Sequence, residues 1–201
     1  MVEPTTFNGG INGVPQFQDR QEMWGSLSVS IGSQAEGALA KFLATLSDVY
    51  DNGTVVHRCF EIGLHPVFQW FWSRDQLREM FFLDKFMALP LVRESLGLKS
   101  VDYDLNTKFK WESPLLMPGH MAWALDEGGA YERPEMTALE IRDLANAAVD
   151  QMIDGRYENA LFFRSGAAWD AFFKNAAWDC TWILTQIDER RVHVILATDT
   201  D

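Results

Sequence analysis

Two apolar segments near the end of the chain place the strongest constraint on its fold. Residues 180–187 and 192–197 are rich in β-branched, aliphatic and aromatic side chains, and the polar residues 188–191 separate them. This pattern predicts an antiparallel hairpin. Both segments are apolar at successive positions, which is typical of strands buried inside a sheet. The rest of the chain is therefore expected to supply further strands and the layers that cover them.

Capping boxes mark the expected helix starts. Ser33, Ser73 and Thr137 are each followed three residues later by Glu or Gln, so each can accept a hydrogen bond from the first helical turn. Apolar residues then recur at helical spacing, and glycines end the first and third of these helices. The expected helices are 33–50, 73–88 and 137–154, with shorter ones at 91–96, 156–163 and 166–177.

Alternation of apolar and polar residues predicts the remaining strands. The expected strands are 26–31, the segment 54–62 after the turn Asn52-Gly53, and a hairpin formed by 101–105 and 109–111. Residues 113–133 contain two prolines and three glycines and show no clear period, so they are interpreted as a long irregular loop, of the kind that is often functional.

These elements predict an α+β fold. The 201 residues suit a single domain, with a mixed or antiparallel sheet of about five to seven strands and several packed helices. Two hairpins argue against an all-parallel sheet. Residues 1–24 are interpreted as an irregular N-terminal arm, and residues 25–201 as the domain. No glycine-rich phosphate loop has the required spacing.

The net charge of −12, from 17 basic and 29 acidic residues, bears on possible partners. Nucleic acid and anionic membranes favour the opposite sign, so neither is expected as a partner, whereas a basic protein would be attracted. No membrane-length apolar run or secretory signal is apparent. Two cysteines do not make a disulfide framework. A cytoplasmic protein with reduced thiols is therefore expected.

The strand 54–62 carries the main candidate for site chemistry. Alternate residues of a strand share a face, so His57, Cys59 and Glu61 are expected to project to the same side, with His65 close behind them. Imidazole, thiolate and carboxylate are ligands of zinc or ferrous iron. These residues therefore suggest a divalent-metal site, although no HExxH or CxxC motif accompanies them. No other cofactor is indicated.

Other interpretations of these and nearby residues remain open. Cys59 could be a nucleophile with His57, His65 or His193 as its base, or simply a small buried side chain. His120, inside the expected loop, is a second place to look for function. The aromatic run 68–72 could line a pocket for a small apolar ligand, or belong to the core.

The acidic residues are concentrated in one part of the chain. Residues 121–160 hold nine carboxylates and three arginines, which is half of the net charge in a fifth of the length. Such a surface can be a solvated face or a docking face for a basic partner. The candidate partner-binding residues are Asp126, Glu127, Glu140, Asp143 and Asp150.

Three functional hypotheses follow. The first is a non-enzymatic intracellular binding protein, of an inhibitor, immunity or regulatory type, that presents the acidic face to a protein partner. The second is a metal-assisted hydrolase or lyase centred on His57, Cys59 and Glu61, in which the metal polarises the substrate or activates water. A domain that binds a small apolar ligand is a third alternative.

Overall fold

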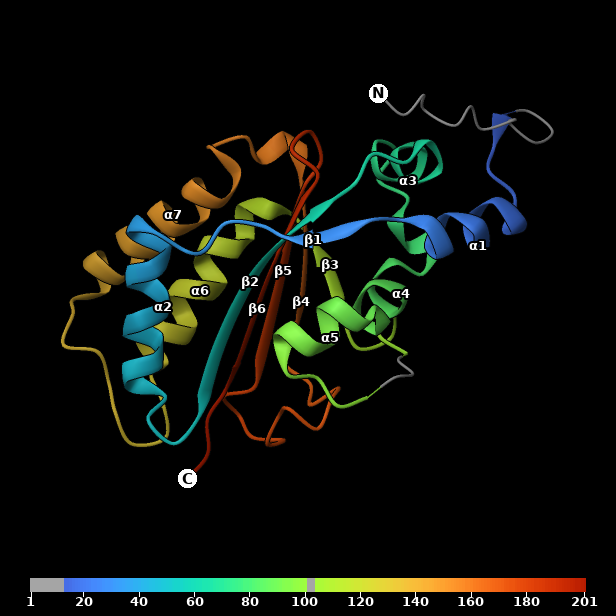
Figure 1. The fold of residues 1–201 in the computed structure, drawn as a ribbon. Helices are drawn as coiled ribbons and strands as arrows, with labels where there is room; N and C mark the ends of the chain where they lie inside the picture. The colour runs from blue at the N-terminus through green and yellow to red at the C-terminus, as the bar shows by residue number, and fades with distance from the viewer. Residues whose placement is uncertain (1–12, 101–103) are drawn as a thin grey trace.

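A six-stranded antiparallel sheet separates two layers of helices (Figure 1). The structure is a computed structural model, and it describes residues 13–100 and 104–201. The strand order is β1-β2-β6-β5-β4-β3, and every neighbouring pair is antiparallel. The α+β prediction with five to seven strands is confirmed.

The C-terminal hairpin lies in the middle of the sheet, as its apolar sequence predicts. β6 (Arg191–Thr198) pairs with β5 (Cys180–Gln186) on one side and with β2 (Thr54–Ile62) on the other. β4 (Ala160–Ser165) continues the sheet beyond β5. The edge strands are short: β1 (Val29–Ile31) borders β2, and β3 (Lys110–Glu112) borders β4.

Successive residues of the central strands pack into different layers. In β6, Val192, Val194 and Leu196 belong to one hydrophobic cluster, whereas Ile195 and Ala197 belong to the other. All five are fully buried. A strand covered on both faces has no solvent-facing positions, which explains why its sequence does not alternate.

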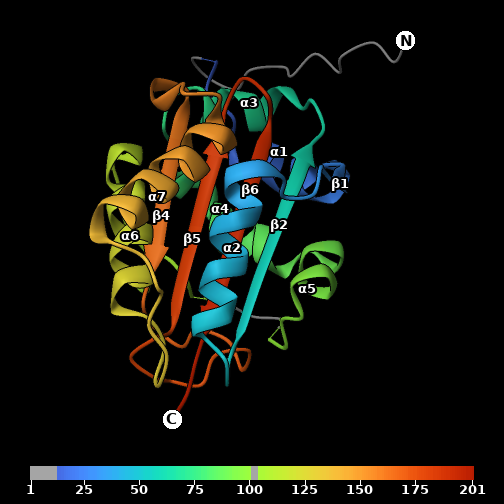
Figure 2. The same cartoon turned by 90° about the vertical axis from the view of Figure 1, so that its left-hand side faces the viewer.

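Three long helices cover one face, which Figure 2 shows from the front. They are α2 (Gly37–Val49), α6 (Met117–Glu127) and α7 (Ala138–Ile153). The capping box predicted at Thr137 is present: its hydroxyl accepts from the Glu140 amide, and the Glu140 carboxylate accepts from the Thr137 amide. α7 also ends next to the predicted glycine, because Asp154 and Gly155 adopt positive φ angles that a helix cannot continue through.

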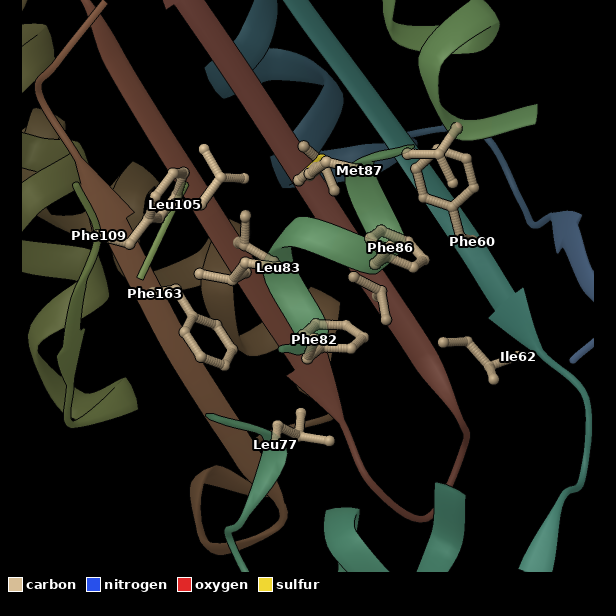
Figure 3. Packing of buried hydrophobic residues seen from close by; sticks show 14 of the residues in the cluster. Phe60, Ile62, Leu77, Phe82, Leu83, Phe86, Met87, Leu105, Phe109 and Phe163 are labelled. Atoms are coloured by element: carbon tan, nitrogen blue, oxygen red, sulfur yellow. The ribbon is translucent and has the colours of Figure 1, made fainter. Parts of the chain in front are cut away.

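Shorter helices cover the opposite face and build an aromatic core (Figure 3). They are α1 (Phe17–Ser26), α3 (Pro66–Trp72), α4 (Phe82–Ala88) and α5 (Pro90–Leu96), together with a 3-10 turn at Leu77–Met80. Phe86 of α4 packs edge-on against Phe60 of β2 and stacks on Phe82, with ring centroids 5.4 and 5.1 Å apart. The helix predicted at 91–96 is confirmed within α5.

The N-terminal third departs from the prediction at several boundaries. Residues 17–26 form α1, although residues up to 24 were expected to be irregular and 26–31 to be a strand. α2 begins at Gly37, not after Ser33, and its N-cap Glu36 makes no side-chain cap. Ser73 is the C-cap of α3 and does not begin a helix, and the left-handed conformation of Phe81 divides the expected helix into the 3-10 turn and α4.

Three predictions in the second half of the chain were wrong. The expected loop 113–133 contains α6, whose Pro118 lies in the first turn, where a missing amide costs no helical hydrogen bond. The expected helix 156–163 is a 3-10 turn at Tyr157–Asn159 followed by the first part of β4, and 166–177 holds no helix. The strand expected at 109–111 is present as β3, where Trp111 pairs with Phe163 of β4; residues 101–103, which form most of its expected hairpin partner, lie outside the described residues.

Two further observations concern the whole fold. None of the helices in the described ranges combines the length and apolarity needed to cross a membrane. Cys59 and Cys180 are both free thiols, the first buried and the second half-buried.

Candidate functional site

The sheet brings His57 and Cys59 of β2 together with His193 of β6. Cys59 and His193 are paired in the register of the two strands, so their side chains lie next to each other on the face covered by α2 and α7. Nε2 of His57 is 3.2 Å from Nδ1 of His193, and the two rings stack with centroids 5.5 Å apart. Nε2 of His193 is 3.8 Å from Sγ of Cys59. His193 therefore bridges the other two side chains.

Burial keeps this cluster uncharged at neutral pH. Desolvation, followed by the nearby charge of Arg58, lowers the pKa of His57 to about 4. Desolvation also lowers the pKa of His193 to about 3, with smaller contributions from His57 and Arg191. The pKa of the Cys59 thiol is raised to about 11, chiefly by burial. The cluster thus consists of two neutral imidazoles and a protonated thiol.

A cavity of about 540 Å³ adjoins the cluster. Val55, His57 and Cys59 line it from β2, Leu43 lines it from α2, and the segment 31–35 closes it at the edge of the sheet. Arg58 also borders it, and its guanidinium donates to the carbonyl of His57 at 2.7 Å. Cys59 itself is only 2% exposed.

The residues predicted as metal ligands do not gather around one point. Glu61 shares the strand face but is exposed, and His65 lies beyond the strand, where its Nδ1 accepts from the amide of Val67 at the start of α3. His193 takes the place expected for His65, but its two nitrogens face different partners, so one ion cannot contact both. In the part of the chain that is described, no group of three or more His, Cys, Asp or Glu residues is arranged to hold a metal ion.

The thiol mechanism also finds little support in this geometry. A nucleophilic cysteine needs a lowered pKa and access to substrate, whereas the pKa of Cys59 is raised and its side chain is buried. The two histidines cannot act as cations at neutral pH, because burial lowers both pKa values. His57, His193 and Cys59 form a chain of polar contacts that links β2 to β6.

The five predicted partner-binding carboxylates are all exposed, on two helices of the same layer. Asp126 and Glu127 end α6, and the other three lie on the outer side of α7. Glu140 also caps its helix, Asp143 pairs with Arg142 at 2.8 Å, and Asp150 accepts from the hydroxyl of Tyr157 at 2.7 Å.

A second polar cluster lies at the other edge of the sheet. Oε2 of Glu112 in β3 is 2.6 Å from Nε2 of His120 in α6, and it accepts from Nε of Arg164 in β4 at 2.9 Å. Arg164 is the main cause that lowers the pKa of Glu112. Each side chain is partly buried, and the three together tie α6 to the edge of the sheet. Sequence reasoning missed Glu112 and Arg164, since no local pattern joins residues 52 positions apart.

The aromatic run 68–72 lies in α3, and most of it belongs to the core. Phe68, Phe71 and Trp72 are each at most 3% exposed. Trp70 is half-buried and borders a surface groove, where the guanidinium of Arg74 lies 4.5 Å from its ring. The run therefore does not form the wall of an enclosed ligand pocket.

Comparison with known proteins adds no assignment. The chain matches no model of a protein family, and a search of curated proteins finds no similar sequence.

Proposed function

We propose that this is a non-enzymatic binding protein that docks a basic protein partner on the surface formed by α6 and α7. The acidic surface consists of Asp126, Glu127, Glu140, Asp143 and Asp150. The observation that carries the proposal is that these exposed carboxylates lie on adjacent helices with little neutralisation: among the described residues, Asp143 alone of the five forms an ion pair. Such a field speeds the encounter with a cationic partner and selects against anionic ones.

An exposed tryptophan lies on the same surface. Trp123 of α6 is 63% exposed and precedes Glu127 by one helical turn. Large aromatic side chains are enriched at the centres of protein interfaces, where they bury much area at little entropic cost. Trp123 therefore supplies an apolar contact next to the charges, which would otherwise contribute more to the association rate than to affinity.

The properties of the other polar clusters favour binding over catalysis. The imidazoles of His57 and His193 are neutral, and the thiol of Cys59 is protonated and buried. The proposal includes a cytoplasmic location, which is consistent with two free cysteines. An inhibitory or regulatory role would follow from occupation of a basic surface on the partner.

Charge reversal on the acidic surface tests this function. The triple variant Asp126→Lys, Asp143→Lys, Asp150→Lys leaves Glu140 in place, because that side chain caps α7. We expect capture of a partner from a lysate of the source cells to be lost in this variant and weakened for the wild type at about 0.5 M salt.

The matched control carries the same change of charge on the opposite layer. Glu22, Glu79 and Glu94 are exposed on α1, the 3-10 turn and α5. Their replacement by lysine should leave capture unchanged. Equal capture by the wild type and the acidic-surface variant, or equal loss in both triple variants, would refute docking on this surface.

A second candidate function is the binding of a small molecule beside His57. The observation that favours it is the cavity of about 540 Å³, which has both apolar and polar walls. Native mass spectrometry of untagged protein should then show a bound molecule that is displaced when the cavity is filled by Val55→Trp. Absence of added mass in the wild type would count against this candidate.

A further inference from the structure

A second pocket is lined by residues near the C-terminal end of α2, the C-terminal end of α6 and the start of β5. Figure 1 shows that the C-terminus lies at this end of the sheet. The volume of the pocket is about 280 Å³, and its walls include three aromatic side chains: Tyr50 after α2, Trp123 on α6, and Trp178 before β5. These rings differ in exposure, since Tyr50 is 4% exposed, Trp178 is half-buried and Trp123 is 63% exposed. The pocket thus leads from open surface to a buried phenol.

One buried carboxylate lines this pocket, and a second lies near Tyr50. Asp179 lines it and is 4% exposed, and its carboxylate is held by the hydroxyl of Thr198 and the amide of Ala176. Asp199 is fully buried. Its Oδ2 accepts from the Ala130 amide at 2.8 Å, while its Oδ1 has no hydrogen-bond partner within the described ranges.

Two carboxylates act on Tyr50 at this end of the pocket. Burial is the main cause that raises the pKa of Tyr50 above its usual range, and the negative charges of Asp199 and Asp179 add to it. Glu127 adds a carboxylate to the lining. The one cationic side chain that lines the pocket, Arg133, has its Nη1 engaged by the carbonyls of Gly129 and Glu132.

Aromatic walls combined with excess negative charge select a cation. Ring faces attract ammonium and guanidinium groups, most strongly for tryptophan, and the attraction grows when the cation loses water. A guanidinium is weakly hydrated, planar, and able to stack on an indole while it donates to a carboxylate. An ammonium is smaller and more strongly hydrated, so it loses more on entering a pocket with aromatic walls.

We propose that this pocket, lined by Tyr50, Trp123 and Trp178, binds an arginine side chain. The guanidinium stacks against the indole rings and donates hydrogen bonds toward Glu127. The identity of the partner that supplies the arginine rests on the proposed function, since the pocket adjoins Asp126 and Glu127 of the acidic surface. The arginine would be the anchor that gives specificity to an otherwise charge-driven encounter.

Binding of a small arginine analogue tests the pocket without any protein partner. The probes are Nα-acetyl-arginine amide, its neutral isostere Nα-acetyl-citrulline amide, and Nα-acetyl-lysine amide. The readout is the indole N–H signals of Trp123 and Trp178 in NMR spectra, identified from the variants Trp123→Phe and Trp178→Phe. We expect saturable shifts with the arginine probe in the millimolar range, and none with citrulline.

Variants separate the pocket from general surface attraction. Trp123→Ala removes an exposed ring and should weaken the arginine probe about fivefold, as a cation–π contact predicts. Glu127→Gln should weaken it as well. The control is Phe17→Ala, which removes a ring of similar exposure, 64%, from α1 and should leave binding unchanged.

The possible results separate the arginine pocket from the acidic docking surface. Equal shifts with citrulline, or no shift with arginine, would overturn the cation site, even if charge reversal on the acidic surface still abolished partner capture. Equal affinity for the lysine probe would overturn the preference for guanidinium. Saturable arginine binding together with partner capture that is insensitive to charge reversal would support the pocket and refute the proposed acidic docking surface.

Discussion

Mild acid should destabilise the fold through the two stacked histidines. Burial holds the pKa of His57 at about 4 and that of His193 at about 3 in the folded protein, against about 6.5 in an unfolded chain. Between these values the unfolded chain binds more protons, so the free energy of unfolding falls as the pH falls below 6.5. At pH 5 each histidine lowers it by about 2 kcal/mol relative to pH 8.

The combined effect, about 4 kcal/mol, is a large share of the stability of an ordinary domain. The charged groups around His57 and His193 do not reverse the direction of this pH effect. Arg58 lowers the pKa of His57, and Arg191 lowers that of His193, so both work in the same direction as burial. Glu61, on the same strand face, is exposed and screened by water.

Urea unfolding followed by tryptophan fluorescence at pH 8 and pH 5 measures this effect. His57→Gln removes one of the two titrating groups and should roughly halve the loss between the two pH values. Leu43→Ala, a change in the same cavity, lowers stability at both pH values and should keep the full difference. Equal stability of the wild type at pH 8 and pH 5 would refute the reasoning, as would imidazole NMR signals of His57 and His193 that titrate near pH 6.5.

Two substitutions test the packing that positions the sites. A methyl group at Gly129 would lie 1.9 Å from the carbonyl oxygen of Val49, so Gly129→Ala should lower the urea midpoint strongly or prevent folding. The control is Gly119→Ala, whose methyl group meets no atom within 4 Å and should leave the urea midpoint unchanged or raise it. Thr185→Val removes the hydroxyl that accepts from the buried indole N–H of Trp72 and should cost about 1–3 kcal/mol, whereas Thr185→Ser should recover most of the loss.

Predictions that depend on local chemistry agree with the structure. The helix after Thr137 begins where its capping box indicates, because both hydrogen bonds of the box form within one turn. The hairpin of β5 and β6 is equally local, since four residues, 187–190, join its strands. In both cases, the interactions that determine the element are made by residues close together in the sequence.

Predictions failed where distant partners decide the local structure. Residues 160–163 are a short apolar run with no helical or alternating period, because the side chains of β4 pack alternately into the hydrophobic clusters on both faces of the sheet. Residues 109–111 alternate as an edge strand should, but the pattern does not specify the partner, which lies more than 50 residues away in β4. Residues 117–127 were missed because Pro118 and Gly119 indicate a loop by composition although a first helical turn accepts proline.

The same distinction explains how much of the candidate sites could be foreseen. Strand alternation correctly placed His57 and Cys59 on one face, but His193 enters only through the pairing of β2 with β6. The pocket lined by Tyr50, Trp123 and Trp178 is less local still, since its rings come from three segments at least 50 residues apart. They meet because α2 and α6 run along the same face of the sheet and both end where β5 begins (Figure 2). Topology, and not any sequence motif, therefore creates the site that we expect to bind arginine.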